Sequence, residues 1–236
     1  MKRELLAAIV EAQQAKRAVA LVTVLDTGAQ ALVSEEAAVV AGDAGLVDDK
    51  IVAAVGTAIS DDRCRTLQTA RGTVFLQTLN PPLRMVIVGA VHITQALAPM
   101  AALMGYEVTV IDPRRAFASP DRFPDLRVVV EWPDDALRAL APDRRTAVVT
   151  LTHDPKLDDP ALKVALESAA FYIASLGSKR THAARVERLK QTGLSDEDIA
   201  RIHGPAGLTI GARSPAEIAA AILAQATQKL RGGKKG

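Results

Sequence analysis

The chain has 236 residues, 49% hydrophobic and 24% charged, so it can bury a core as one large or two modest globular domains and is not a disordered protein. A net charge of +2 and an aromatic content of 3% argue against a nucleic-acid-binding surface. No apolar run reaches the roughly 18 residues of a membrane helix, and the first residues fit an amphipathic helix better than a signal peptide. We therefore expect a cytoplasmic protein with no membrane or nucleic-acid partner.

Residues 1–80 are predicted to form a small α+β domain. Its predicted elements are a helix at Lys2–Gln14, strands at Ala18–Leu25 and Gln30–Val33, a helix at Val47–Ile59, and strands at Arg65–Thr69 and Thr73–Leu79. Asn80-Pro81-Pro82 then breaks the chain and marks a domain boundary.

The segment Leu25-Asp-Thr-Gly-Ala29 resembles the active-site loop of retroviral-type aspartic proteases. Those enzymes need two such carboxylates that share a proton, supplied by a dimer or by a second copy of the loop. The chain contains no second copy. A hairpin turn at Asp26-Thr27-Gly28 is therefore the simpler interpretation.

The single cysteine, Cys64, excludes an internal disulfide and agrees with a reducing compartment. Asp61 and Asp62 oppose the thiolate that Arg63 and Arg65 would favour. We therefore interpret Cys64 as a small hydrophobe or an incidental surface thiol rather than as a reactive group.

Residues 83–230 are predicted to form a Rossmann-like α/β domain, because continuous apolar strands alternate with amphipathic helices in a doubly wound pattern. The predicted strands are Arg84–Val88, Val108–Ile111, Arg127–Val130, Ala147–Leu151 and Phe171–Ala174. Ser195 and Ser214 each begin a sequence that fits a capping box, and Pro215–Leu230 forms the last helix. We expect residues 231–236 to be a flexible basic tail.

The segment Val86-Ile-Val-Gly-Ala-Val-His-Ile-Thr94 stands where a Rossmann domain carries its dinucleotide-binding loop, and Asp112 follows at the spacing of a nicotinamide site. Only Gly89 matches the Gly-x-Gly-x-x-Gly pattern. Val91 occupies the second glycine position, where its side chain would obstruct a pyrophosphate, and Thr94 occupies the third. We interpret Gly89 first as a tight structural turn, and a nicotinamide-dependent oxidoreductase is the alternative function.

Basic side chains and helix starts meet at the predicted carboxyl edge of the sheet, a pattern that suits an anionic ligand. His92 stands at the start of the helix after the first strand, and Arg114 and Arg115 follow the second strand. A capping histidine and a pair of solvated arginines are the structural alternatives.

A second anion-binding pattern is the loop Gly177-Ser178-Lys179-Arg180, in which free helix N–H groups accompany two cations. Here we favour the functional interpretation. The basic residues farther along the same helix are expected on its solvated face: Arg185, Arg188 and Lys190.

His153, Asp154, Asp158 and Asp159 raise a metal hypothesis, because imidazole and carboxylates are competent ligands. Asp158 and Asp159 are better explained by Pro160, with Asp159 as the N-cap of a helix. His153 and Asp154 are candidates either for contact with a ligand or for holding the loop.

Five ordered blocks of the second domain carry a family resemblance. They are Val86–Ile93, Val110–Arg114, Leu151–Asp154, Phe171–Arg180 and Arg201–Ile218. Together these blocks resemble the XdhC/CoxI family over the whole second domain, with Val91 and Ala174 at positions where that family commonly has glycine.

Members of that family are accessory proteins of molybdenum hydroxylases such as xanthine dehydrogenase and carbon monoxide dehydrogenase. The resemblance implies that the chain transiently binds the molybdenum cofactor (molybdopterin), protects it while a cysteine desulfurase replaces an oxo ligand with sulfur, and delivers it to the apo-enzyme. It implies a maturation chaperone rather than an enzyme, with a homodimer as a further candidate assembly.

The residues expected to contact the cofactor lie at the starts of the loops described above, and none is assigned a catalytic or metal-ligating role. They are Gly89, His92, Asp112, Arg114, His153, Asp154, Gly177, Ser178 and Arg180. The first domain lacks the family's usual Gly-Ser-x-x-Arg and Gly-Gly-Gly blocks, so we expect it to support folding or partner docking. A scaffold that recruits the hydroxylase without binding cofactor is a further alternative.

Overall fold

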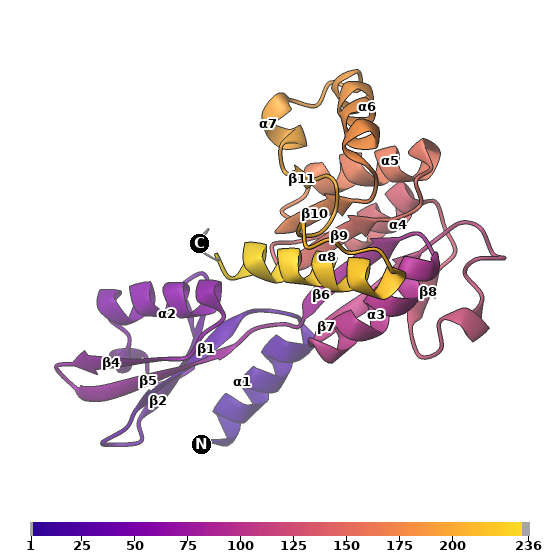
Figure 1. Ribbon diagram of the computed structural model, residues 1–236. Helices are drawn as coiled ribbons and strands as arrows, with labels where there is room; N and C mark the ends of the chain where they lie inside the picture. Colours follow the sequence, from indigo (N-terminus) through magenta and orange to yellow (C-terminus); the bar gives the residue numbers. More distant parts are fainter. Residues whose placement is uncertain (1, 233–236) are drawn as a thin grey trace. The chain divides into compact units, whose positions relative to one another are not determined.

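The computed structural model describes residues 2–232, which form two compact units: a first that ends at Pro81 and a second that begins at Pro82 (Figure 1). Residues 233–236 of the predicted flexible tail lie outside the described residues. Within the described part of the chain, no helix is both long and apolar enough to cross a membrane.

The first unit is an antiparallel sheet of order β3-β2-β1-β5-β4 with one helix on each face. Its elements are α1 (Arg3–Gln14), β1 (Val19–Val24), β2 (Gln30–Ser34), β3 (Val39–Gly42), a 3-10 turn (Ala44–Leu46), α2 (Asp49–Asp61), β4 (Arg65–Thr69) and β5 (Gly72–Leu79). Side chains of β1 alternate between the faces: Val19 and Leu21 pack with α1, whereas Ala20 and Val22 pack with α2.

The turn at Asp26-Thr27-Gly28 joins β1 to β2, as the hairpin interpretation predicts. Gly28 has a φ of +71°, and its N–H donates to the carbonyl of Val24 at 2.8 Å. The Asp26 carboxylate accepts the Thr73 N–H, so it braces the neighbouring hairpin. Cys64 is exposed and free, which agrees with a surface thiol.

The second unit is a fully parallel sheet of order β11-β10-β9-β6-β7-β8. Its strands are β6 (Leu83–Val88), β7 (Tyr106–Ile111), β8 (Arg127–Val129), β9 (Thr146–Thr150), β10 (Tyr172–Ser175) and β11 (Ile202–His203). Counted from β6, this is the 3-2-1-4-5-6 order of a Rossmann domain, with the switch between β6 and β9. The predicted fold class, a Rossmann-like domain beside a small α+β domain, is confirmed.

Helices cover both faces of this sheet (Figure 1). The helices are α3 (His92–Leu103), α4 (Pro133–Leu140), α5 (Pro155–Leu166), α6 (Lys179–Lys190), α7 (Asp196–Ile199) and α8 (Pro215–Leu230), with a 3-10 turn at Pro120–Arg122. Met85 and Ile87 of β6 face α3 and α8, while Val86 and Val88 face α4 and α5. Because both faces are covered, the strands are apolar throughout.

Several local predictions need correction. Ser214 closes a reciprocal capping box with Glu217, but Ser195 only caps α7 through the Asp198 N–H, without the return bond. Asp159 does not cap a helix: α5 begins at Pro155 with Asp154 as its N-cap. Pro155 takes the first helical position because its missing N–H is not needed there.

Two leucines of α3 provide a first test of how this helix packs on the sheet. Leu97 is fully buried between α3 and the sheet, whereas Leu103 on the same helix is 89% exposed. We expect Leu97→Ala to lower the free energy of unfolding by about 2–5 kcal/mol, the range for deleting a buried leucine side chain. Leu103→Ala is the matched control and should change it by less than about 0.5 kcal/mol. Urea unfolding followed by circular dichroism measures both, and equal effects would contradict the assigned packing.

Candidate functional site at the carboxyl edge of the sheet

The Asp112 carboxylate joins the loops that follow β6 and β7. It is fully buried and accepts hydrogen bonds from the Ala90 N–H at 2.8 Å and from Arg114 Nε and Nη2 at 2.8 and 2.7 Å. Burial alone would raise the pKa of Asp112, but the hydrogen bonds from Arg114 and Ala90 outweigh it and hold the pKa below its usual value. Asp112 is therefore occupied within the protein, while Arg114 remains 35% exposed.

Gly89 lets the loop after β6 press against the loop after β9. Its φ is +113°, and a Cβ atom placed there would lie 2.8 Å from Thr152 Cγ2. The Thr94 hydroxyl donates to the Gly89 carbonyl at 2.5 Å, and Arg122 donates to the Ala90 carbonyl at 2.9 Å. The glycine is thus required by a close approach between loops, as the tight-turn interpretation predicts.

The start of α3 presents His92 to solvent. His92 is the first residue of the helix, and the N-cap Val91 has no side-chain hydrogen bond to offer. In a nicotinamide site the acid after the second strand binds a ribose hydroxyl. Here that acid is Asp112, whose carboxylate is engaged with Ala90 and Arg114. The geometry therefore disfavours nicotinamide binding for a reason additional to Val91.

The Asp158 carboxylate fixes the turn after β9 through hydrogen bonds. It is 1% exposed and accepts hydrogen bonds from the Thr152 hydroxyl at 2.7 Å and from the His153 N–H at 3.1 Å. Burial raises the pKa of Asp158 even though these bonds and the charge of Arg185 oppose the shift. His153 has a φ of +61° and an exposed side chain, so a strained backbone presents its imidazole at the sheet edge.

Asp154 and Asp159 have structural roles on α5. Asp154 caps the helix by accepting the Lys156 N–H at 2.9 Å. Asp159 forms a bidentate ion pair with Arg188, at 2.5 Å to Nε and 3.1 Å to Nη2. Across residues 2–232, no three His, Cys, Asp or Glu side chains gather closely enough to hold a metal ion. The four residues of the metal hypothesis accordingly do not form one cluster.

The loop after β10 leads into α6. Gly177 has a φ of +147°, and Ser178 is the N-cap, accepting the Thr181 N–H at 3.1 Å. Arg180 lies exposed in the first turn. Arg185, expected on the solvated face, is instead 2% exposed and donates from Nη2 to the Leu176 carbonyl at 2.9 Å. That expectation was wrong because neighbouring loops cover this side of the polar helix α6.

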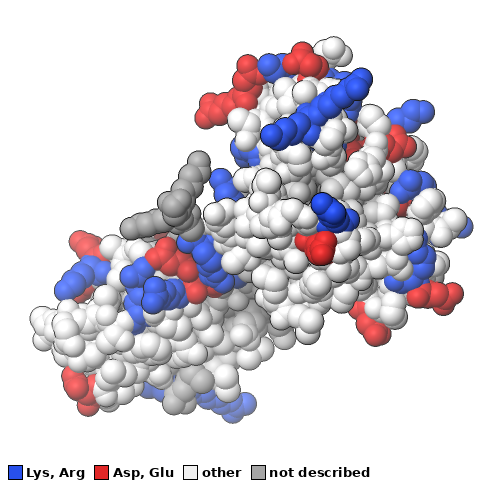
Figure 2. Space-filling view, in the orientation of Figure 1, with Lys and Arg blue, Asp and Glu red and all other residues white. Residues whose placement is uncertain are grey.

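The parallel sheet brings these loops to one edge, since β10, β9, β6 and β7 are consecutive neighbours. The hydrogen bonds that Arg114 donates to Asp112 raise the pKa of Arg114, and the charges of Asp154 and Asp158 add to that shift across the loops. On the face shown in Figure 2, basic and acidic side chains are interspersed over α6 and α7, whereas the surface over α8 is largely uncharged.

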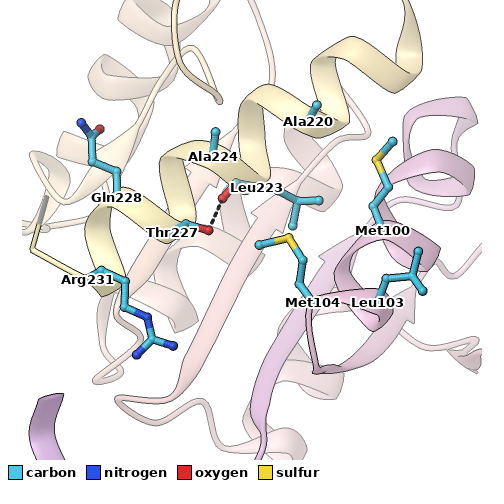
Figure 3. Close-up of a pocket in the computed structure, with 9 residues that line it drawn as sticks. All are labelled: Met100, Leu103, Met104, Ala220, Leu223, Ala224, Thr227, Gln228 and Arg231. Atoms are coloured by element: carbon cyan, nitrogen blue, oxygen red, sulfur yellow. Dashed lines mark hydrogen bonds between the residues drawn. The ribbon is translucent and has the colours of Figure 1, made fainter. Parts of the chain in front are cut away.

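A separate apolar groove of about 750 Å³ lies between α3 and α8. Figure 3 shows the side chain of Met104, the C-cap of α3, pointing toward Leu223 of α8, with Met100 and Leu103 of α3 on the same side of the groove. The three residues from 100 to 104 lie at the end of α3, which begins at the carboxyl edge of the sheet and runs toward the opposite edge. The groove is therefore distinct from the polar loops, and its apolar lining does not suit an anionic ligand.

Topology and loop chemistry together define a Rossmann domain with an altered phosphate-binding loop, and Arg114 and Arg180 stand at the carboxyl edge of its sheet. The XdhC Rossmann domain matches residues 85–226, and the chain belongs to the XdhC family.

Curated relatives agree with this assignment. The chain is 31% identical over 156 residues to the uncharacterized protein YqeB of Escherichia coli, covering 66% of this chain and 29% of that protein. It is 32% identical over 165 residues to the molybdenum cofactor insertion chaperone PaoD of Escherichia coli, covering 69% of this chain and 46% of PaoD. It is 30% identical over 156 residues to a protein of Bacillus subtilis named as a probable xanthine dehydrogenase subunit, covering 66% and 45%. The chain thus spans less than half the length of these relatives.

A solved structure is similar over both units. A Bacillus halodurans protein described as a xanthine dehydrogenase aligns with a TM-score of 0.72 and 26% identity. The alignment covers 99% of this chain and 66% of that one. The similarity therefore includes the first unit as well as the Rossmann domain.

The Asp112 contacts generate a second test. We expect Asp112→Asn to lower the free energy of unfolding by about 1–3 kcal/mol at neutral pH, the range for a buried hydrogen-bonded charge. Because the pKa of Asp112 is depressed in the folded protein, this stabilisation is complete above the ordinary carboxyl pKa and is lost as pH falls through the folded value. Urea unfolding at neutral pH and in steps below about pH 4 measures both effects.

Asp135→Asn serves as the control, because Asp135 is 71% exposed and forms only a surface pair with Arg138. It should change the unfolding free energy by no more than about 0.5 kcal/mol. If the loss of unfolding free energy caused by Asp112→Asn grew as the pH falls, the assigned role of this carboxylate would be contradicted.

Proposed function

We propose that the second unit binds the molybdenum cofactor in the loops that follow β6, β7, β9 and β10, and that the chain acts in maturation of a molybdenum hydroxylase. The observation that carries the proposal is the set of helix starts and cations at this edge, combined with membership of the XdhC family. A relative over 69% of this chain is named as a molybdenum cofactor insertion chaperone.

The donors at this edge fit the chemistry of the cofactor, a pterin with a phosphate and a dithiolene-bound metal oxo group. The uncapped start of α3 carries His92, and the start of α6 carries Arg180. Arg114 donates to Asp112, and its guanidinium lies 4.3 Å from the Phe117 ring centre. Helix N–H groups and guanidinium groups bind oxyanions without catalytic proton transfer.

His153 is the side chain we assign to orienting the cofactor at the centre of this edge. Its backbone is fixed by Asp158 and the adjoining N-cap Asp154, while its imidazole makes no hydrogen bond within residues 2–232. A fixed backbone with an unpaired imidazole presents one hydrogen-bonding group to a ligand at little further conformational cost. Asp112, Asp154 and Gly89 act through loop shape rather than through direct contact.

Maturation follows from binding without turnover. The cofactor, when bound, supplies the molybdenum centre whose oxo ligand a cysteine desulfurase exchanges for sulfur. The chain's own contribution is selective retention, exclusion of water from the bound group and delivery to the apo-enzyme. We assign partner docking, to the apo-hydroxylase, the desulfurase or a second copy of the chain, to the first unit and to surfaces away from the carboxyl edge.

Anaerobic titration of the purified chain with molybdenum cofactor tests this proposal. We expect stoichiometric molybdenum and pterin fluorescence to co-elute with the protein in gel filtration. His153→Ala should weaken retention about tenfold, the effect of one lost hydrogen bond to a charged ligand. Arg138→Ala, which alters an exposed surface pair on α4, is the control and should retain cofactor normally.

Parallel titrations separate the alternatives. Retention of NAD instead of the molybdenum cofactor would establish the oxidoreductase alternative. Retention of neither ligand, together with co-purification of an apo-hydroxylase, would establish the scaffold alternative and overturn the proposal.

A further inference from the structure

The first turn of α6 leaves a row of backbone donors unused. Within the described residues, the N–H groups of Gly177, Ser178, Lys179 and Arg180 donate to no acceptor. Unpaired N–H groups at the positive end of a helix favour an anion nearby. A helix start alone does not define a site, so what lies beneath these donors decides the matter.

The buried guanidinium group of Arg185 lies next to Gly177, at the start of this row of N–H groups. Arg185 Nη2 donates to the carbonyl of Leu176, the residue that precedes Gly177, and lies 3.8 Å from the position of a Cβ atom built on Gly177. Arg185 is 2% exposed, yet its Nε and Nη1 atoms have no hydrogen-bond partner. Burial lowers the pKa of Arg185, which marks the cost of holding this charge away from water.

The carboxylates near Arg185 form their hydrogen bonds with other groups. Asp158 directs its oxygens to Thr152 and His153, and Asp159 is engaged by Arg188. Within residues 2–232, Arg185 forms no ion pair. Asp158 and Asp159 act on Arg185 through charge alone, so two buried guanidinium donors stay without a hydrogen-bond partner, which is costly unless a ligand uses them or their field.

The corresponding position at the start of α3 differs in its buried charge. There the buried group is the carboxylate of Asp112, which already takes the Ala90 N–H and is ion-paired with Arg114. The charge beside α3 is therefore balanced within the protein, whereas the buried cation beside α6 forms no ion pair within residues 2–232 and favours an anion. Of the two helix starts, the start of α6 is the more favourable for an anion.

We infer that the first turn of α6 is an oxyanion site, in which N–H groups of residues 177–180 contact a tetrahedral oxyanion and Arg185 is its buried counter-charge. Phosphate and molybdate share this chemistry, and the cofactor carries both a phosphate and a metal oxo group. The inference rests on the proposed function only for the molecule that brings the oxyanion. Arg185 is a positioning residue that acts through charge beneath the loop.

Titration of the ¹⁵N-labelled full chain with sodium phosphate and, separately, with sodium molybdate tests the site. We expect saturable amide shifts centred on residues 177–180. A response to phosphate alone assigns the site to the phosphate of the cofactor, and a response to molybdate alone assigns it to the metal oxo group. Shifts centred on the start of α3, or no saturable shift with either anion, would overturn the inference.

A proline substitution isolates one backbone donor. Lys179 is the first residue of α6, and Ser178 before it has φ −79° and ψ 166°, a conformation compatible with a following proline. Lys179→Pro removes both the charge and the N–H, whereas Lys179→Ala removes the charge alone. We expect Lys179→Pro to bind about tenfold more weakly than Lys179→Ala. Asp49→Pro, at the first position of α2, is the control for a proline at a helix start.

Arg185→Met should weaken oxyanion binding about tenfold through loss of the buried charge, and Arg185→Lys should restore most of it. Arg185→Met also removes the bond to the Leu176 carbonyl and the charge that opposes the raised pKa of Asp158, so the unfolding midpoint is measured beside binding to separate lost binding from lost folding. An Arg185→Met protein that is folded and binds as tightly as wild type would overturn the assignment of Arg185.

The two proposals fail separately. Cofactor retention without any oxyanion response at residues 177–180 overturns this site and leaves the proposed function intact. An oxyanion response at these residues in a chain that does not retain cofactor overturns the proposed function and leaves the site.

Discussion

The parallel pairing of β6 with β9 is the constraint on which the site depends, because the strand order reverses there and the two following loops leave the sheet side by side. Gly89 is the consequence in the backbone: its missing Cβ allows contact with Thr152 of the neighbouring loop. Buried carboxylates then fix each loop, Asp112 through Ala90 and Asp158 through Thr152 and His153. These acids hold backbone in place, so they are not available as proton-transfer groups.

This use of buried acids explains the chemistry of the edge. With Asp112 and Asp158 turned inward, the groups that remain outward are helix N–H groups, the His153 imidazole and the cations Arg114 and Arg180. Helix N–H groups and guanidinium groups are donors for oxyanions, which supports the proposal that this edge holds the cofactor. Selective binding and release of the cofactor is the activity that we propose for this arrangement.

The sequence predicts the second unit well, because buried parallel strands are continuous apolar runs that stand out between amphipathic helices. The short edge strands β3 and β11 were missed, since so few residues leave no periodic signal. Asp159 was misassigned as an N-cap because Asp154-Pro155 and Asp159-Pro160 carry the same helix-start signal. Which of the two begins the helix depends on the length of the preceding turn.

The burial of Arg185 could not be predicted from the sequence for a different reason. Its helix α6 is polar, so periodicity indicates no buried face at this position. The burial arises from tertiary neighbours: the Leu176 carbonyl accepts from Arg185, and His182, one turn earlier, packs against Gly204 of the loop after β11. No local pattern identifies such a residue, whereas the turn at Gly89 and the strand-to-helix turn at Gly177-Ser178 were predicted because glycine and helix-start signals are local.

Anomalous diffraction at the molybdenum edge from crystals of the cofactor-loaded full chain tests the central claim most directly, because it locates the metal without reference to activity. We predict one molybdenum peak at the carboxyl edge of the sheet, among the loops that carry His92, His153 and Ser178. A peak in the apolar groove between α3 and α8, or one within the first unit, would contradict this prediction.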